Sequence, residues 1–368
     1  MNRIQTFCFL SSIMVLSVGC QNQQDSASYL TEDSFTQITL DTVFEFSESA
    51  NVAFRSIHTI KSDEHGNVLV HDFSQPYLIM FDQDGNFLSR IGNEGRGPGE
   101  FQGISGFIVD ENNLWVIDAR NIKMEKFEYQ QGKYVHIRTI PLGSMELTGG
   151  ILGKTEEGFF INNRITLVAG SDSNPTERPI SLIDENGEIL VNTVFALPIE
   201  EQMRLQGLGN VFEGSLIFGN QSLMAFDGIN RMYTLWTDSL SIYTYTTDRY
   251  RRHAFSHKLE PVKLTDQEKD SISRRYHIYQ ADLRRKLPDV KPLVNDLIMD
   301  DNQRVWVELL TENLGHGWFV FTNEGAPLYK MDIPKPGAKL QEVSGNRVYW
   351  NYVNDDGLPI FVVSNIRI

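Results

Sequence analysis

The chain has 368 residues but only two cysteines, Cys8 and Cys20, and both lie among its first twenty residues. A scaffold held by disulfides is therefore excluded for the remainder of the chain. The uncharged, mostly apolar run over residues 7–18 is too short to cross a bilayer as a stable helix, although it suits the core of a secretory signal. The sequence also lacks a Gly-x-Ser-x-Gly elbow, so we expect no nucleophile of that kind.

The N-terminus has the pattern of an export signal. Arg3 supplies a positive start, and the apolar run ends at Ser17-Val18-Gly19-Cys20, before the polar residues 21–24. Small residues ending at a cysteine resemble the bacterial lipobox, although Ser17 stands where leucine is usual. This resemblance implies a signal peptide over residues 1–19, lipid attachment at Cys20 and a flexible tether over 20–36. The expected location is the cell envelope, where the lipid would anchor the protein to a bacterial membrane, in the first place the outer membrane. An ordinary cysteine near a conventional cleavage site stays open as the alternative.

Short acidic or amide-rich turns, each followed by alternating apolar residues, recur six times along the chain. They open near Asp63, Asp110, Glu156, Asp227, Asp300 and Ser344. Successive turns are 47, 46, 71, 73 and 44 residues apart, so three intervals agree and two contain insertions. A period in the forties, built from short strands and tight turns, is typical of a propeller blade. We therefore predict an all-β fold over residues 37–368, a six-bladed β-propeller with four-stranded antiparallel blades.

The last blade has only three strand-like segments of its own, around Leu340 and over residues 347–352 and 360–363. An incomplete blade would leave exposed edges. The spare apolar segment before the first blade, residues 38–46, could supply the missing strand. We therefore predict that residues 40–46 pair with residues 360–366 and close the ring.

One helical insertion is expected between blades four and five, over residues 265–287. Thr265 and Glu268 have the spacing of a capping box, in which both side chains satisfy free amides at a helix start. The apolar residues that follow recur at helical spacing, and Pro288 ends the pattern. They are Ile272, Tyr276, Tyr279, Leu283 and Leu287.

The charge is unevenly distributed. The formal net charge is −15, which makes nucleic-acid binding improbable for an exported body, yet residues 249–286 contain eleven Lys and Arg against five Asp and Glu. Arg274, Arg275 and Arg285 are therefore candidate ligand-binding residues, for acidic lipid headgroups, an acidic glycan or a partner protein. The alternative is a solubilising helix face that pairs with the acidic remainder.

Several motifs that could carry chemistry have a simpler structural interpretation. The glycine-rich residues 92–101 lack the Lys-Ser/Thr of a phosphate loop, which favours a crossover between blades. The turn at Asp82 lacks the glutamate of an EF-hand, since Asn93 holds that position. His253 and His257 have zinc-like spacing but no evident third ligand. The five tryptophans could stack on a sugar, although their place in strand runs favours packing. They are Trp115, Trp236, Trp306, Trp318 and Trp350.

Residues 92–101, Gly-Asn-Glu-Gly-Arg-Gly-Pro-Gly-Glu-Phe, resemble a junction in bacterial six-bladed β-propeller lipoproteins related to NHL-repeat proteins. Trp236-Thr237-Asp238 also looks like a fragment of the YWTD repeat of other six-bladed propellers. The resemblance implies a six-bladed protein of the cell envelope and transfers no catalytic residue.

These observations favour a non-enzymatic binding or scaffolding module for a protein or glycan ligand. The ligand surface is expected at one end of the ring, decorated by the polar excursion at residues 170–179 and by the helix. The competing class is a metal-dependent hydrolase, lactonase or lyase with an axial calcium or zinc, which rests on fold analogy alone. No cofactor is predicted, but carboxylates from different blades could still meet at an axial calcium site.

Overall fold

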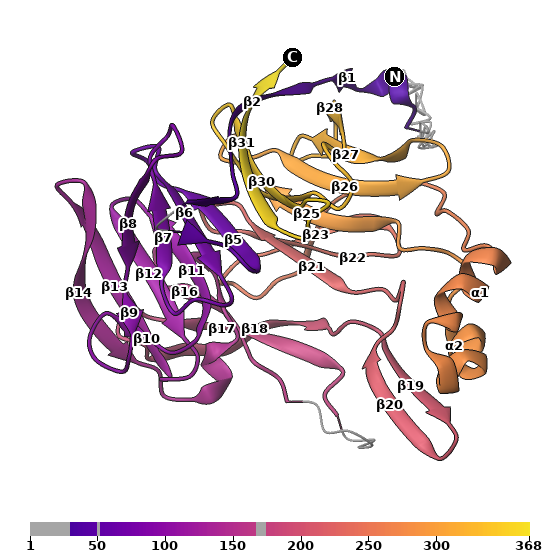
Figure 1. The fold of residues 1–368 in the computed structure, drawn as a ribbon, viewed down its shortest axis with the longest axis horizontal. Helices are drawn as coiled ribbons and strands as arrows, with labels where there is room; N and C mark the ends of the chain where they lie inside the picture. Colours follow the sequence, from indigo (N-terminus) through magenta and orange to yellow (C-terminus); the bar gives the residue numbers. More distant parts are fainter. Residues whose placement is uncertain (1–29, 50–51, 167–173) are drawn as a thin grey trace, which may run out of the picture.

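Six blades, each built on four antiparallel strands, are arranged around a common centre, and the fifth blade carries one additional short parallel strand (Figure 1). The structure is a computed structural model that describes residues 30–49, 52–166 and 174–368. It confirms the predicted six-bladed β-propeller. The first strand of each blade is innermost, and these six strands contact one another in ring order.

The strands of the first three blades follow one another in sequence. Blade one contains β5 (Ile57–Ser62), β6 (Val68–Asp72), β7 (Leu78–Phe81) and β8 (Phe87–Ile91). Blade two contains β11 (Ile104–Asp110), β12 (Asn113–Asp118), β13 (Lys123–Gln130) and β14 (Lys133–Pro141). Blade three contains β15 (Ile151–Lys154), β16 (Phe159–Asn162), β17 (Glu177–Ile183) and β18 (Ile189–Pro198).

Of the last three blades, blades five and six include strands from the beginning of the chain. Blade four contains β21 (Ser222–Phe226), β22 (Met232–Trp236), β23 (Leu240–Tyr245) and β24 (Arg252–His257). Blade five contains β25 (Val294–Met299), β26 (Val305–Thr311), β27 (Gly315–Phe321), β28 (Pro327–Asp332) and the added strand β1 (Thr36–Gln37). Blade six contains β29 (Lys339–Ser344), β30 (Arg347–Val353), β31 (Pro359–Arg367) and β2 (Thr39–Phe46).

The ring closes as predicted, through pairing of β2 with β31. The register aligns Leu40 with Ile366 and Phe46 with Phe361. The body of the domain begins earlier than the expected boundary at residue 37, because Leu30 and Phe35 are buried in the core of blades four and five. The segment expected to be a tether over 20–36 therefore packs against the propeller from residue 30 onward.

Apolar side chains fill the space between neighbouring blades, since both faces of a blade are covered. Every residue of β6 and β7 is buried. Val70 packs in one cluster with Phe361 of blade six, whereas Leu69 packs in another with Val116 of blade two. Because alternate side chains of a strand point to opposite faces, a single strand supplies two of the interfaces between blades.

The predicted acidic turns are present, and their aspartate side chains accept hydrogen bonds from backbone amides. Asp63 Oδ1 accepts hydrogen bonds from the amides of His65 and Asn67, at 3.0 and 2.8 Å. The carboxylates of Asp82, Asp227 and Asp300 accept amides of their own turns in the same way. At Asp82 this arrangement supports turn chemistry in place of a calcium loop.

The glycine-rich residues 92–101 form a crossover between blades one and two. The two-residue strands β9 (Asn93–Glu94) and β10 (Glu100–Phe101) pair in parallel. Glu100 accepts the amide of Gly97 at 2.8 Å, so the loop's own carboxylate takes the place that a phosphate would need. The structure thus agrees with a structural junction.

The helical insertion is present but is broken into two helices. It consists of α1 (Asp266–Arg274), the 3-10 turn η3 (His277–Tyr279) and α2 (Gln280–Lys286), and the capping box at Thr265 is formed. The predicted helical insertion over 265–287 is therefore confirmed, but the helix is interrupted in its middle, where His277 adopts a φ of 38°. A positive φ at a residue other than glycine cannot continue a right-handed helix.

A β-hairpin that the turn spacing had located only as an insertion packs against these helices. It consists of β19 (Gln202–Gly207) and β20 (Asn210–Ser215), between blades three and four. We call the hairpin and residues 265–287 the arm, which projects from the propeller body (Figure 1). The arm has its own small apolar core, in which Leu205 and Leu283 are fully buried.

The remaining short elements are η1 (Glu32–Ser34), η2 (Met145–Thr148), β3 (Glu48–Ser49) and β4 (Val52–Ala53). None of the helices in the described part of the chain has the length and apolar character to span a bilayer.

Candidate ligand site at the axial mouth

The six innermost strands all begin on one face of the ring, which we call the leading face. The second strand of each blade ends there, as the pairing of Ile57 in β5 with Asp72 in β6 illustrates. The centre of this face, here termed the axial mouth, carries a group of charged, imidazole and aromatic side chains from three neighbouring blades. They are His58, His71, Phe73, Asp296 and Lys339.

Lys339 connects the three blades electrostatically. It is the first residue of β29, its side chain is exposed, and its charge lowers the pKa values of both His58 in β5 and Asp296 in β25. For His58, burial is the larger cause of the lowered pKa. Within the described ranges no carboxylate forms an ion pair with Lys339. The mouth thus presents a cation whose charge is available to an incoming group.

Asp296 forms the acidic side of the mouth. Burial raises its pKa to about 7, and the carboxylate of Glu308 on the neighbouring strand β26 raises it further, against the lowering effect of the Leu297 amide and Lys339. Glu308 in turn lies 2.7 Å from Nε2 of His316. Near neutral pH Asp296 therefore changes between a hydrogen-bond donor and a charged acceptor.

An aromatic group forms the opposite side of the mouth. The rings of His58 and Phe73 lie 3.9 Å apart between centroids, and His71 lies 5.7 Å from His58. Phe73 is 59% exposed, whereas His71 is 1% exposed. Burial lowers the pKa of His71 to about 4, and the nearby His58 contributes in the same direction. Nδ1 of His71 is buried and has no hydrogen-bond partner within the structure as described. A buried polar atom without a partner is rare and calls for a ligand or a water.

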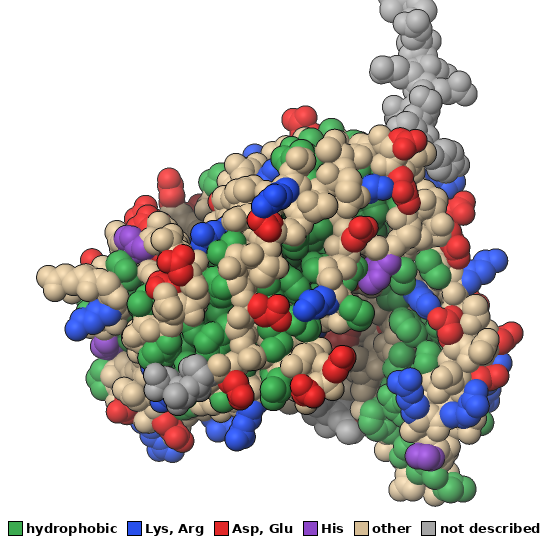
Figure 2. Space-filling model, turned by 45° about the horizontal axis from the view of Figure 1, so that its top comes forward, with side chains coloured by type: hydrophobic (Ala, Val, Ile, Leu, Met, Phe, Trp, Pro, Cys, Tyr) green, Lys and Arg blue, Asp and Glu red, His purple; other side chains and the backbone are tan. Residues whose placement is uncertain are grey.

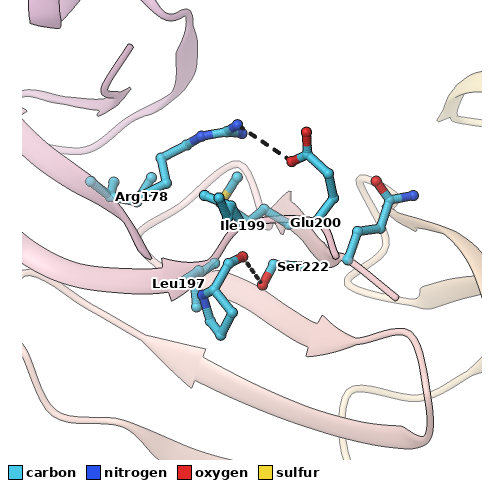
Figure 3. Close-up of a pocket in the computed structure, with 9 residues that line it drawn as sticks. Arg178, Leu197, Ile199, Glu200 and Ser222 are labelled. Carbon is cyan, nitrogen blue, oxygen red and sulfur yellow. Dashed lines mark hydrogen bonds and ion pairs between the residues drawn. The ribbon is translucent and has the colours of Figure 1, made fainter. Parts of the chain in front are cut away.

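Two hollows lie away from the axis. One is a small pocket of about 50 Å³ between blades three and four, where Arg178 and Glu200 face each other at 3.9 Å and the Ser222 hydroxyl donates to the carbonyl of Pro198 (Figure 3). The other is a groove of about 310 Å³ beneath the closing strand, lined by residues that include Leu40, Lys335 and Trp350. The first is far smaller than a typical ligand pocket, and the second lies at the lower end of that size range.

The predicted ligand-binding arginines lie on the arm and not at the mouth. Arg274 ends α1, Arg275 follows it and both are exposed, whereas Arg285 in α2 pairs with Asp282 at 2.9 Å. Arg284 beside them pairs with carboxylates of α1. Arg284 and Arg285 thus pair with carboxylates of the arm, whereas the alternative interpretation had expected partners on the acidic propeller. Ligand binding by Arg274, Arg275 and Arg285 stays a prediction.

The remaining sequence candidates have local roles or lie outside the described residues. His253 contacts the Ser256 hydroxyl at 2.7 Å, and His257 contacts the carbonyl of Gly325 at 2.7 Å. Four of the five tryptophans are buried, with Trp236 half-buried, which agrees with packing. Cys20 and residues 167–173 of the polar excursion lie outside the described residues.

Metal ligation finds little support among the residues described. No three His, Cys, Asp or Glu side chains of residues 30–49, 52–166 and 174–368 are grouped so that they could hold an ion. At the mouth, Asp296 pairs across the strands with Glu308 and is influenced by the cation Lys339. This donor set fits neither the six to eight oxygens of calcium nor a three-ligand catalytic zinc site.

Sequence reasoning missed the whole axial mouth. Its residues come from three blades and are separated by up to 281 positions, from His58 to Lys339. The sequence did contain a signal for these residues, because each of them lies near the start of the first strand of a blade or near the end of the second strand. Alignment of the blades on their turns would have placed His58, Asp296 and Lys339 at similar heights.

Comparisons with known proteins agree with this architecture. Residues 13–162 match a family described as a six-bladed β-propeller. A Bacteroides fragilis protein whose given name calls it exported is 14% identical, with a TM-score of 0.51 over 92% of this chain and 97% of that chain. A Bacteroides vulgatus protein of the DUF4221 family is 12% identical, with a TM-score of 0.49 over 90% of this chain and 99% of that one.

A gluconolactonase of Xanthomonas campestris is 11% identical, with a TM-score of 0.45 over 90% of both chains. The chain has no match among curated proteins. At these identities the likeness concerns the fold and not the activity. The family match over residues 13–162 and the six blades together show that this chain is a six-bladed β-propeller protein, similar in fold to the Bacteroides fragilis protein.

Proposed function

We propose that this chain is a lipid-anchored binding protein of the bacterial cell envelope, held at the outer membrane through Cys20, which captures an acidic glycan at the axial mouth without catalysing a reaction. The observation that carries the ligand site is the buried Nδ1 of His71, which has no hydrogen-bond partner among the described residues, at a mouth where Lys339 forms no ion pair with a described carboxylate. The lipobox-like Ser17-Val18-Gly19-Cys20 supports the anchor. The exported Bacteroides fragilis protein supports a location outside the cytoplasm.

The chemistry of the mouth suits a sugar that carries a carboxylate. Lys339 supplies the cation for the carboxylate, and the exposed ring of Phe73 supplies an apolar face for the sugar ring. His58 and His71 are largely neutral at neutral pH because burial lowers their pKa values, so they offer hydrogen bonds without adding charge. Such a combination of one charge, a few polar atoms and an aromatic surface is typical of ligand recognition.

Calorimetric titration with glucuronate oligosaccharides tests the proposal. We expect binding by the wild type and a loss of about tenfold or more for Lys339→Met and for Phe73→Ala, since each removes one of the main contacts. Lys133→Met replaces an exposed lysine in blade two and serves as the matched control. A neutral glucose oligosaccharide should bind more weakly. Equal binding of both sugars, or no effect of either mouth variant, would contradict the proposal.

The enzymatic alternative gives a different result in the same preparation. A metal-dependent lactonase or lyase would retain stoichiometric calcium or zinc after gel filtration and would lose turnover on chelation. A binding module should show neither property, and its glycan affinity should be unchanged by EDTA.

A further inference from the structure

The free end of the arm exposes an unusual set of apolar side chains. Leu208 in the β19–β20 turn is 85% exposed, Val211 51%, Ile278 42% and Phe212 39%. Gly207 packs so closely against the backbone of Ile278 that a side chain at Gly207 would lie 2.0 Å from its carbonyl oxygen. The hairpin turn and η3 therefore meet at one point, which we call the arm tip.

Neither the backbone conformation nor side-chain packing accounts for a leucine at position 208. It forms the two-residue hairpin turn with Gly209, and both adopt positive φ angles of 47° and 81°. A turn with two positive φ angles favours Asn, Asp or Gly at its first position and disfavours a branched apolar residue such as leucine. An apolar residue that strains the turn and points into water indicates a role outside the folded chain itself.

Two arginines that form no ion pair with a carboxylate of the described residues accompany this apolar tip. Arg274 and Arg275 are exposed and lie just before η3 in the chain. The carboxylates of the arm already have other partners. Asp266 and Asp270 pair with Arg284, Asp282 pairs with Arg285 and Lys286, and Glu268 pairs with Lys291. Figure 2 shows hydrophobic, histidine and basic side chains together on the arm at the lower right.

We propose that the arm tip docks onto an anionic phospholipid surface. Leu208, Ile278 and Val211 would enter the interface, while Arg274 and Arg275 contact the lipid phosphates. Apolar side chains flanked by cations are the combination that holds amphipathic segments in a membrane interface. A second copy is disfavoured as the partner, because two chains that each carry a formal net charge of −15 repel one another.

The position of the N-terminal anchor is compatible with this orientation. Leu30, ten residues after Cys20, has its carbonyl bound by the Asn313 side chain at 3.1 Å. Asn313 lies in the turn between β26 and β27. In this turn the amide of Glu312 donates to the carbonyl of Glu260, at 3.0 Å, just before the helical insertion begins. Ten residues reach at most about 35 Å, and a six-residue hairpin strand spans about 20 Å. A lipid at Cys20 and the arm tip can therefore contact one membrane.

Vesicle sedimentation with the unlipidated chain tests the proposal. Residues 20–368 with Cys20→Ser contain every described element, and their binding to phosphatidylethanolamine–phosphatidylglycerol vesicles is compared with binding to pure phosphatidylcholine vesicles. We expect clear binding to the anionic vesicles, weakened by salt. Leu208→Asn should reduce the partition coefficient about tenfold, because it removes one buried leucine. Arg274→Gln/Arg275→Gln should reduce it by a similar factor.

The variants are chosen so that misfolding cannot explain a loss. Asparagine suits the positive φ at position 208, so Leu208→Asn should keep or raise the melting temperature. Ile229→Asn replaces an apolar residue that is 60% exposed in a turn of blade four, and Arg55→Gln/Lys133→Gln removes two exposed cations from blades one and two. Both controls should bind vesicles like the parent chain.

Three results would overturn the proposal. The parent chain could fail to bind anionic vesicles, the tip variants could bind as well as the controls, or the parent chain could form a dimer that Leu208→Asn dissociates. The last result would assign the tip to contact between copies instead of a membrane.

Discussion

Leu40 lies directly opposite Ile366, so that a strand from the beginning of the domain completes the blade formed by its end. At the other end of the same strand pair, Phe361 lies opposite Phe46 and is fully buried, and its ring lies 5.5 Å from Phe44 and 5.0 Å from Phe81 of blade one. The closing strand thus joins blades six and one through a shared aromatic cluster.

We expect Phe361→Ala to lower the free energy of unfolding by about 3–5 kcal/mol, because it leaves a cavity at the point where the ring closes. Urea unfolding followed by circular dichroism measures the change. Ile368→Ala truncates a residue that is 76% exposed just after the same strand and should change stability by less than about 0.5 kcal/mol. Similar small effects of both substitutions would mean that the seam contributes little to stability.

Asp296 should make the protein less stable as the pH rises. Its pKa is raised to about 7 from 3.8, so the folded state holds a proton more tightly than the unfolded state. The stabilising contribution is complete below pH 3.8 and is lost as the pH rises through 7. We expect the stability gain of Asp296→Asn over the wild type to be larger at pH 8 than at pH 5 by about 1–2 kcal/mol, because much of the wild type's contribution is lost between these pH values.

Asp355→Asn, in an exposed turn of blade six, is the matched control for the loss of one carboxylate. Unfolding in urea at both pH values separates the two variants. A stability of Asp296→Asn that follows the wild type at every pH would show that Asp296 ionises normally in the folded protein.

His71 should act in the opposite direction over the acidic range. Its pKa is lowered to about 4 from 6.5, so the unfolded state binds the proton more tightly. Its contribution is present above pH 6.5 and is lost as the pH falls through 4, by up to about 3 kcal/mol. In His71→Leu we expect a shallower fall in melting temperature between pH 7 and pH 4, whereas the exposed His253→Gln should retain the slope of the wild type. Parallel curves for all three proteins would argue against a buried neutral imidazole.

The glycine-rich junction allows two steric effects to be separated. A side chain at Gly92, where φ is 84°, would lie 2.2 Å from the ring of Phe101. At Gly132, where φ is 85°, no atom lies within 4 Å of the same position. We expect Gly132→Ala to cost about 1 kcal/mol through backbone strain alone, and Gly92→Ala to cost about 3 kcal/mol or more because Phe101 must also move. Equal losses of unfolding free energy for the two variants would show that Phe101 can move aside at little cost.

The number of blades and the closing strand could be predicted from the sequence because they depend on local patterns. Turn residues such as Asp63 and Asp300 act on amides only a few positions away, so their chemistry is visible in a short window. The apolar alternation of residues 40–46 likewise needs one partner of matching pattern, and the unfinished last blade provides it. The capping box at Thr265 is local in the same sense.

The two long intervals between blade turns were interpreted as insertions, but the sequence did not predict that the hairpin and the helices in them pack against each other. The amide of Gln206 in the hairpin donates to the Asp282 carboxylate in α2 at 2.9 Å, across 76 residues of sequence. No periodicity relates these segments, since each packs its apolar residues against the other and not against a blade. The break at His277 belongs to the same packing, because η3 lies against the hairpin at Gly207.

The sequence by itself therefore determined the repeated blade, its turns and the strand that closes the ring, since these follow from alternation and from hydrogen bonds between near neighbours. Only the tertiary structure decided the axial mouth and the arm tip. His58, Asp296 and Lys339 come together because six sheets share one axis, and Leu208 meets Ile278 because two insertions from neighbouring blades are long enough to touch. Such proximity depends on how the sheets are arranged around the ring, which no short stretch of sequence records.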